Sequence, residues 1–286
     1  MNPLARPGAA LFCVLMVAAV AAPWLAPEDP LRLARIDLNQ AGKPPAWSGP
    51  NGQWLGTDAQ GRDLLSLILH GMRLSLAAAG MAVLVTLLVG VPAGLLAGYA
   101  GGLVDSALMR LADAQMSFPL ILIAITFNGI AAARLGLVGR EAWMLPIVSV
   151  SIGLSQWAVM ARAVRAVTTG ERGKAYVEAA QVYGAGHAAI LLRHVLPNTL
   201  GPVTVLAAMQ VSTAVLAEST LSFLGAGLPI STPSLGTLVR TGNEQLLAGA
   251  WWLPVFPGMA LLLLGVAANL AGDWVQERLD PKDEAR

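Results

Sequence analysis

Six long apolar stretches constrain this chain more than any other feature, because about 20 consecutive apolar residues are enough to cross a bilayer as a helix. The stretches cover residues 8–26, 74–100, 114–133, 143–161, 201–224 and 251–272. In lipid a spanning segment must satisfy its own backbone hydrogen bonds, which favours helices. The sequence therefore predicts an all-α polytopic membrane protein with six transmembrane helices.

Composition supports a membrane location. Hydrophobic residues make up 56% of the 286 residues and charged residues 12%, whereas about a quarter of a soluble domain is charged. The net charge of +1 and the lack of a basic tract with interleaved aromatic residues give no indication of nucleic-acid binding. The single cysteine, Cys13, lies in the first stretch and can form no disulfide within the chain.

The chain divides into three parts by its apolar pattern. Residues 1–73 hold the first helix and a long outer loop, residues 74–275 form the main membrane domain, and residues 276–286 form a polar tail. The first stretch has a second interpretation as a signal peptide, since Arg6 precedes it and Ala-Val-Ala at 19–21 resembles a cleavage site. In the loop, prolines between 27 and 50 argue against a helix, and Thr57 and Asp58 are expected to start the next one.

Basic residues indicate the orientation. With the amino terminus inside, ten of the eighteen Lys and Arg residues fall on the inner side, and five of these lie in the connection 162–200. The outer connections other than the first loop hold only Arg134, Arg140 and Arg240. The positive-inside rule therefore predicts that both termini and the connection 162–200 are cytoplasmic.

The connection 162–200 has the pattern of a helical hairpin. Residues 176–183 are good helix formers, Gly184 can end that helix in a left-handed conformation, and residues 188–195 form a second helical run that Pro197 is expected to stop. Glu-Ala-Ala at 178–180 is followed by Gly184 and later by Leu-Pro. A compact knob with small residues is suited to enter a groove on a partner.

This spacing resembles the cytoplasmic coupling loop of permease subunits of ATP-binding cassette importers. Three further matches point to the second permease of dipeptide, oligopeptide and nickel importers. They are Leu-Gly-Thr-Asp-x-x-Gly-Arg-Asp at 55–63, Leu-Ser-Phe-Leu-Gly at 221–225 with Thr-Pro-Ser at 232–234, and Asn-Leu-x-Gly-Asp-Trp at 269–274 with Leu-Asp-Pro at 279–281. The sequence departs from the family pattern at Ala226, Ile230-Ser231 and Leu235 in the outer loop and at His194 in the coupling loop.

The resemblance implies a function and a set of partners. The chain would form half of a translocation pathway, beside a homologous permease, two ATP-binding subunits and an extracytoplasmic solute-binding protein, in a bacterial inner membrane. The residues that couple it to the ATPase would be Glu178, Ala179, Ala180, Gly184, Leu196 and Pro197. Di- or oligopeptides are the first cargo it implies, and nickel or another metal chelate is the alternative.

Within the apolar stretches, a few residues are candidates for packing or for the pathway. Gly90, Gly94 and Gly98 share one helical face and permit close helix packing. Glu218 and Asp113 are acids in or beside lipid, where charge is costly and often functional. Glu218 is suited to line the pathway or to hold a structural hydrogen bond, and Asp113 is expected to pair with Arg110 or to line the pathway.

Prolines should break three of the predicted helices. Pro92, Pro119 and Pro257 lie within apolar stretches. Each removes a backbone donor and is expected to kink or interrupt its helix.

Two other classes of function fit the sequence less well. An intramembrane enzyme would need a nucleophile or metal motif, and neither HExxH, GxSxG nor a phosphate-binding loop is present. We therefore expect no catalytic residue, no metal site and no cofactor, with ATP hydrolysis in separate subunits. A self-sufficient secondary carrier would show repeated halves and several intramembrane ion ligands, which the sequence lacks.

Overall fold

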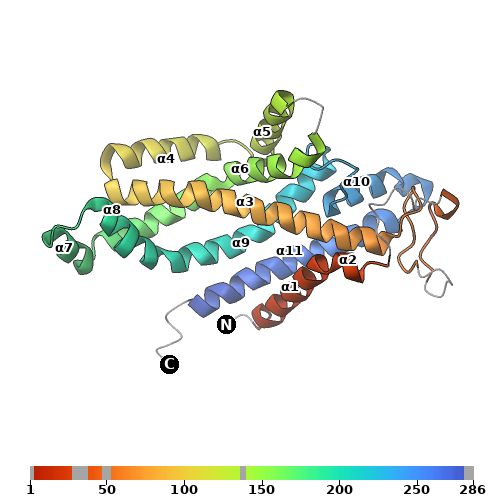
Figure 1. Ribbon diagram of the computed structural model, residues 1–286, viewed down its shortest axis with the longest axis horizontal. Helices are drawn as coiled ribbons and strands as arrows, with labels where there is room; N and C mark the ends of the chain where they lie inside the picture. The colour runs from red at the N-terminus through yellow and green to blue at the C-terminus, as the bar shows by residue number, and fades with distance from the viewer. Residues whose placement is uncertain (1–2, 28–37, 47–52, 136–139, 280–286) are drawn as a thin grey trace.

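The computed structural model describes residues 3–27, 38–46, 53–135 and 140–279, and in them it confirms an all-α fold (Figure 1). The helices are α1 (Ala5–Val20), α2 (Ala22–Leu25), α3 (Leu64–Ala100), α4 (Gly102–Met116), α5 (Leu120–Leu135), α6 (Arg140–Arg172), α7 (Ala175–Val182), α8 (His187–Ile190), α9 (Leu196–Phe223), α10 (Leu235–Glu244) and α11 (Trp252–Leu279). A π-helical segment, Leu191–Val195, joins α8 to α9. Short 3-10 turns occur at Leu38–Gln40 and Leu246–Ala248.

Four helical segments are long and apolar enough to cross a membrane. They are Leu64–Ala100, Trp143–Arg172, His187–Phe223 and Trp252–Leu279. Helices α4 and α5 meet at a 95° bend and give a fifth span if the pair is counted as one, while α1, with 16 residues, is shorter than a full span. The predicted count of six spans is therefore not confirmed in the described residues. Four helices are long and apolar enough to span on their own, and the number is five if the bent pair α4–α5 counts as one span.

The bend explains why the third apolar stretch is not a straight helix. The prediction of one helix over 114–133 is wrong, because α4 ends at Met116 and α5 begins at Leu120. Pro119 stands immediately before α5, where its missing N–H and fixed backbone angle are tolerated. Pro92 and Pro257, in contrast, lie inside α3 and α11.

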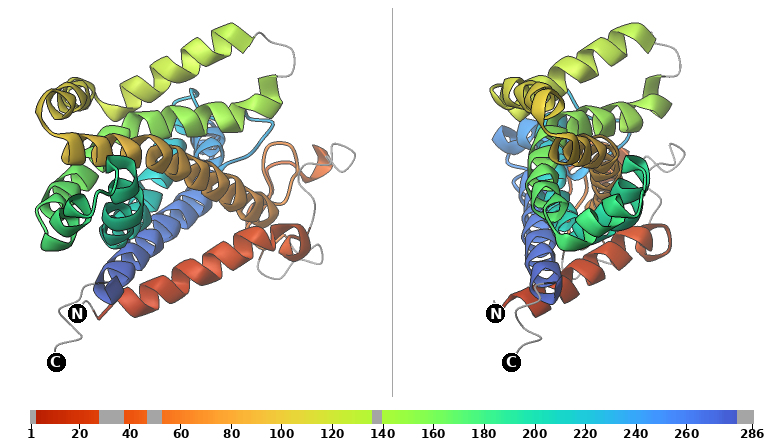
Figure 2. Two further views of the ribbon diagram at one scale, coloured as in Figure 1. Left: turned by 60° about the vertical axis from the view of Figure 1, so that its left-hand side comes forward. Right: turned by 90° about the vertical axis from the view of Figure 1, so that its left-hand side faces the viewer.

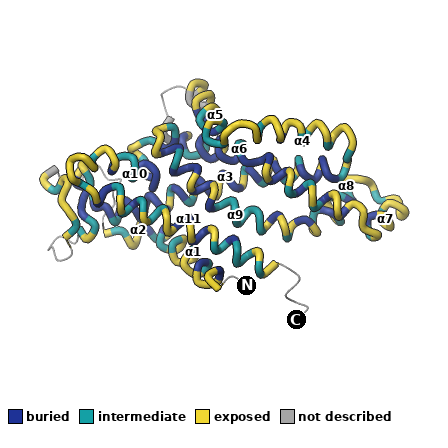
Figure 3. The backbone as a smooth tube through the Cα atoms, turned by 180° about the vertical axis from the view of Figure 1, so that it is seen from behind, coloured by how far each residue is buried: buried dark blue, intermediate teal, exposed yellow. Residues whose placement is uncertain are grey.

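Long helices run side by side along the molecule (Figures 1 and 2). Helices α7 and α8 lie at one end, and α10 lies at the other end with the chain around residues 53–62. The main apolar core draws on α1, α3, α5, α6, α9, α10 and α11. Buried backbone is concentrated along α3 and α6, whereas α4 and α7 are largely exposed (Figure 3).

Glycines let α3 and α6 approach closely. Gly90, Gly94 and Gly98 are all buried. A Cβ atom placed on Gly94 would lie 2.5 Å from the carbonyl oxygen of Ala161 and 2.6 Å from Cβ of Val164. Such distances are sterically forbidden, so at this helix crossing the backbones pack in the space where side chains would otherwise lie.

The start of α3 differs from the prediction. Asp63, not Thr57 or Asp58, is the N-cap, and its Oδ2 accepts a hydrogen bond of 2.8 Å from the backbone N–H of Ser66. Asp58 instead holds a turn, because its Oδ1 accepts 2.8 Å hydrogen bonds from the backbone N–H groups of Gln60 and Arg62. A positive φ of 77° at Gly61 keeps that turn out of a helix.

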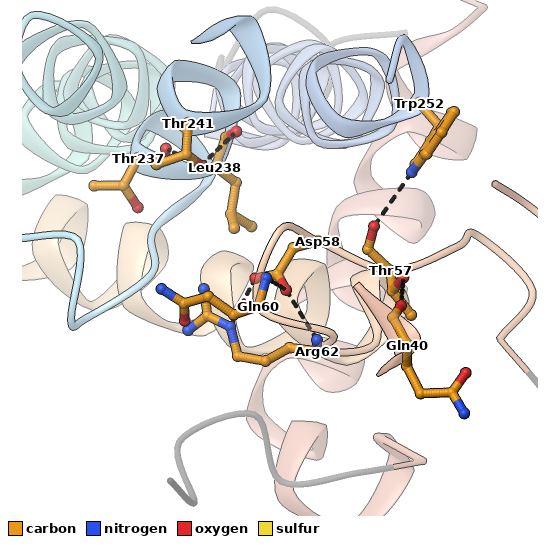
Figure 4. A network of polar contacts seen from close by, with 9 residues as sticks. All are labelled: Gln40, Thr57, Asp58, Gln60, Arg62, Thr237, Leu238, Thr241 and Trp252. Carbon is orange, nitrogen blue, oxygen red and sulfur yellow. Dashed lines mark hydrogen bonds and ion pairs between the residues drawn. The ribbon is translucent and has the colours of Figure 1, made fainter. Parts of the chain in front are cut away.

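Thr57 joins two parts of the connection between α2 and α3. Its hydroxyl donates to the carbonyl oxygen of Gln40 at 2.5 Å and accepts from the backbone N–H of Lys43 at 2.9 Å. The indole N–H of Trp252 at the start of α11 donates to the Thr57 carbonyl at 3.4 Å (Figure 4). Residues 28–37 and 47–52 lie outside the described residues, so the predicted irregular course of 27–50 is described only in part.

Candidate functional site: the coupling loop and the intramembrane acids

Helix α7 and the turn after it form a small helical knob at one end of the molecule. The helix spans eight residues and ends at Val182, and Gly184 adopts a φ of +78°. Only glycine takes this conformation without strain. The sharp turn expected at Gly184 is thus present, and it reverses the chain toward α8.

The knob presents a particular set of side chains outward. Glu178, Ala179 and Gly184 are exposed, as are Val182 at 86% and Tyr183 at 90%. Val182 and Tyr183 therefore leave apolar side-chain surface uncovered at the tip of the knob. Sequence reasoning missed Val182 and Tyr183, although their helical spacing from Glu178 and Ala179 places them on the same face.

The opposite face of α7 holds the knob on the membrane helices. Val177 is fully buried, in one apolar cluster with Ile190 and Val195, and Ala180 packs partly buried against this cluster. Ala180, predicted to contact a partner, therefore packs inward at least in part. The knob cannot tilt without uncovering this cluster.

Polar contacts reinforce the base of α7. The Tyr176 hydroxyl donates to Oε2 of Glu171 at 2.6 Å, and Lys174 Nζ lies 2.6 Å from Oε1 of the same carboxylate. Asn198 Nδ2 in α9 donates to the Tyr176 hydroxyl at 3.3 Å. Burial and the neighbouring Glu171 carboxylate raise the pKa of Tyr176 to about 12. Tyr176 therefore remains a hydrogen-bond donor throughout the physiological pH range.

The second half of the loop corrects the expected role of Pro197. The helical run does not stop there, because α8, the π-helical segment and α9 are continuous from His187 to Phe223. Pro197 lies in the first turn of α9. The π-helical segment Leu191–Val195, where the regular α-helical hydrogen bonding is interrupted, ends two residues before Pro197. The carbonyl oxygen of His194 accepts a 2.6 Å hydrogen bond from Nδ2 of Asn198. Leu196 packs partly buried on the cluster under α7, while Pro197 is exposed.

Glu218 lies inside the protein, near the carboxyl-terminal end of α9. Its side chain is fully buried and accepts hydrogen bonds from Ser75 of α3 and Ser222, both at 2.8 Å, and from Ser219 at 3.3 Å. The Ser75 hydroxyl also accepts from the backbone N–H of Leu235 at the start of α10, at 3.2 Å. This geometry favours the structural interpretation of Glu218, since it ties three helices together.

Asp113 pairs across two helices. Its carboxylate contacts Arg162 of α6, so the pairing expected with Arg110 is wrong. Nearby, Arg165 makes a two-point ion pair with Asp105, with N–O distances of 2.5 and 2.6 Å. The two pairs fasten α4 to α6. The Asp113 side chain is 54% exposed, and its place in the pathway stays a prediction.

A pocket of about 220 Å³ with both polar and apolar lining opens at the other end of the molecule, between the Asp58 turn and α10. Its lining includes Asp58, Gln60 and Arg62 from the turn and Thr237 and Thr241 from α10 (Figure 4). Asp58 and Arg62 form an ion pair at 2.7 Å. Within the described part of the chain, no group of three or more His, Cys, Asp or Glu side chains is placed to hold a metal ion.

Comparison with known proteins identifies the family. The profile of the binding-protein-dependent transport system inner membrane component matches residues 90–283. The chain is 34% identical over 281 residues to the dipeptide transport system permease protein DppC of Bacillus subtilis, covering 98% of this chain and 82% of the relative. It is 36% identical over 278 residues to the di/tripeptide transport system permease protein DppC of Pseudomonas aeruginosa, covering 96% and 87%.

A third relative is named for a different cargo. The glutathione transport system permease protein GsiD of Pectobacterium atrosepticum is 34% identical over 277 residues, with 96% of this chain and 86% of the relative covered. The matches span nearly the whole chain, including the knob and the helices that hold it. This chain belongs to the family of inner membrane components of binding-protein-dependent transport systems.

Proposed function

We propose that this chain is a permease subunit of an ATP-driven importer for di- and oligopeptides. The family supports a role in transport, and the relatives described above are named for dipeptide, di/tripeptide and glutathione transport. The observation that carries the proposal is the knob formed by α7. It combines exposed Val182 and Tyr183 with a base fixed to α6 and α9.

The knob is the element that couples this subunit to ATP hydrolysis. Glu178, Ala179, Val182, Tyr183 and Gly184 form a small, partly apolar surface that enters a groove on an ATP-hydrolysing subunit. Movement of that subunit reaches the membrane along two rigid connections. One is Tyr176–Glu171 to α6, and the other is the continuous helix from His187 to Phe223.

The proposed contact between the knob and an ATP-hydrolysing subunit also implies where the other partners lie. Two ATP-binding subunits lie on the cytoplasmic side, where both termini also lie, and a homologous permease completes the pathway within the inner membrane. The extracytoplasmic solute-binding protein meets the opposite end, which carries α10 and the pocket at Asp58. A self-sufficient carrier does not agree with a family whose transport depends on a binding protein.

Peptides are a better cargo than a metal chelate. None of the relatives compared above is named for nickel. The cargo is tested by expressing the complete importer and measuring uptake of a labelled dipeptide and of nickel.

The uptake experiment has a clear outcome. Dipeptide uptake should depend on this subunit and on ATP, and nickel uptake should not. Nickel uptake without peptide uptake would refute the cargo proposal while leaving the family unchanged. Uptake by this chain alone in vesicles, without ATPase subunits, would refute the permease proposal as a whole.

A further inference from the structure

A second cavity, of about 350 Å³, lies beside the knob but is not part of its exposed tip. It is lined by Tyr99 and Ala100 at the end of α3, Arg172 at the end of α6, Gln181 of α7 and His187 of α8. These residues come from four helices that meet at this end of the molecule. The proposed coupling function makes no use of this cavity.

The lining is suited to an anion. It contains no acidic side chain, and Arg172 forms no ion pair with an acid in the part of the chain that the structure describes. Guanidinium groups present a planar set of donors that match phosphate and carboxylate oxygens. The Tyr99 hydroxyl and Nδ1 of His187 lie 3.0 Å apart. The amide of Gln181 supplies a further donor.

A glycine leaves room for the arginine. Gly101, directly after α3, has a φ of +68°, and a Cβ atom there would lie 3.1 Å from Nη1 of Arg172. The guanidinium group therefore lies against the turn between α3 and α4.

The cavity lies at the depth of lipid headgroups. The apolar stretch of α6 ends near Ala161, whose carbonyl oxygen faces Gly94 of α3. Tyr99 is five residues further along α3, which corresponds to about 7 Å. A headgroup layer is about 5–8 Å thick on each side of the hydrocarbon core. Tyrosine is also typical of this interface.

We propose that this cavity binds a phosphate group. Arg172 supplies the charge, the amide of Gln181 donates a hydrogen bond, and the Tyr99–His187 pair, whose members hydrogen-bond to each other, supplies one further donor. An anionic lipid headgroup and free inorganic phosphate share this chemistry. The bound group bridges the ends of α3 and α6 to α7 and α8, and so stiffens the base of the knob.

The test uses a cysteine at Ala100, which lines the cavity without donating a side-chain hydrogen bond. Cys13→Ser removes the chain's own cysteine, and the complete importer carrying Ala100→Cys is reconstituted in vesicles. The rate at which a membrane-permeant maleimide modifies this subunit is measured under three conditions. These are phosphatidylcholine alone, phosphatidylcholine mixed with phosphatidylglycerol, and phosphatidylcholine with added inorganic phosphate.

The expected result is about fivefold slower modification with phosphatidylglycerol, the effect of one basic side chain at an anionic surface. Arg172→Gln should abolish the protection. Arg193→Gln is the matched control, since it removes an exposed charge of the same loop that does not line the cavity, and it should retain protection. Copurification of the other subunits checks that each variant is assembled.

The three conditions distinguish a lipid headgroup, free phosphate and a protein partner as the occupant of the cavity. Protection by phosphatidylglycerol alone identifies a lipid headgroup, and protection by inorganic phosphate identifies the soluble anion; both support the site. Equal rates in all three conditions would overturn it, as would equal protection in Arg172→Gln. Protection that requires only the ATPase subunits, whatever the lipid or phosphate, would show that a protein partner fills the cavity and would also overturn it.

Discussion

Replacing Gly94 by alanine tests whether close backbone packing between α3 and α6 holds the membrane domain together. The added Cβ atom would lie 2.5 Å from the carbonyl oxygen of Ala161, whereas ordinary contacts begin near 3.4 Å. The helices must therefore separate by about 0.9 Å at this crossing. Overpacking of this kind costs about 1–3 kcal/mol.

Gly80→Ala in the same helix is the matched control. A Cβ atom at Gly80 meets nothing within 4 Å, and alanine is the better helix former by about 1 kcal/mol. Both variants gain this helix propensity, so they should differ in stability by about 1–3 kcal/mol, the cost of overpacking at Gly94. Gly94→Leu should be more damaging still.

The assay is thermal unfolding of the purified complex in detergent, together with the yield of assembled complex. Gly94→Ala should lower the unfolding temperature, and Gly80→Ala should maintain or raise it. Equal unfolding temperatures for the two variants would refute the packing argument and would leave the face with Gly90, Gly94 and Gly98 free to contact lipid.

Three further predictions concern orientation, Glu218 and pH. A cysteine at Ala188 should react with an impermeant thiol reagent only from the cytoplasmic side, and labelling in intact cells would contradict the orientation. Glu218→Ala should lower stability by about 1–3 kcal/mol, because it leaves buried serine hydroxyls without their acceptor, and Glu218→Gln should cost less; normal stability with lost uptake would indicate a pathway role instead. The raised pKa of Tyr176 contributes stability that is complete below pH 10 and is lost as the pH rises toward 12. The unfolding temperatures of wild type and Tyr176→Phe should therefore differ by a constant amount between pH 7 and 9. Between pH 10 and 12 they should converge.

Local patterns in the sequence predicted much of the helical fold. Length and hydropathy located α3, α6, α9 and α11, because these properties belong to consecutive residues. The left-handed turn at Gly184 was predictable for the same reason. The right-angled bend before Pro119 was not, since a proline indicates a break but not the direction in which the chain continues.

Contacts between residues far apart in the chain could not be predicted from the sequence. Glu218 is 143 residues from Ser75, its hydrogen-bond partner, and nothing in the local pattern connects them. Asp113 was expected to pair with Arg110 on its own helix, yet α4 packs on α6 and brings Arg162 closer. Pro197 was expected to end a helix, but a π-helical segment before it lets the helix continue.

The residues of the candidate site were likewise predictable only in part from the sequence. The coupling residues Glu178, Ala179 and Gly184 were inferred from a motif and are exposed on the knob. Val182 and Tyr183 carry no motif signal, and their exposure was visible only once Val177 was seen to bury the other face. The assignment of all these residues to ATPase contact remains a prediction.

The double variant Glu178→Arg with Gly184→Pro tests the central claim of coupling most directly. Gly184 needs a φ of +78°, which proline cannot adopt, and Glu178→Arg reverses an exposed charge at the proposed contact. Neither residue lies in a spanning helix, so the membrane domain should insert normally. The measurement is ATP-driven dipeptide uptake by the reconstituted importer, with ATPase subunits quantified in the same preparation. We predict that uptake is lost, with the ATPase subunits released or hydrolysing ATP without transport; wild-type uptake with normal ATPase content would contradict the coupling role of the knob.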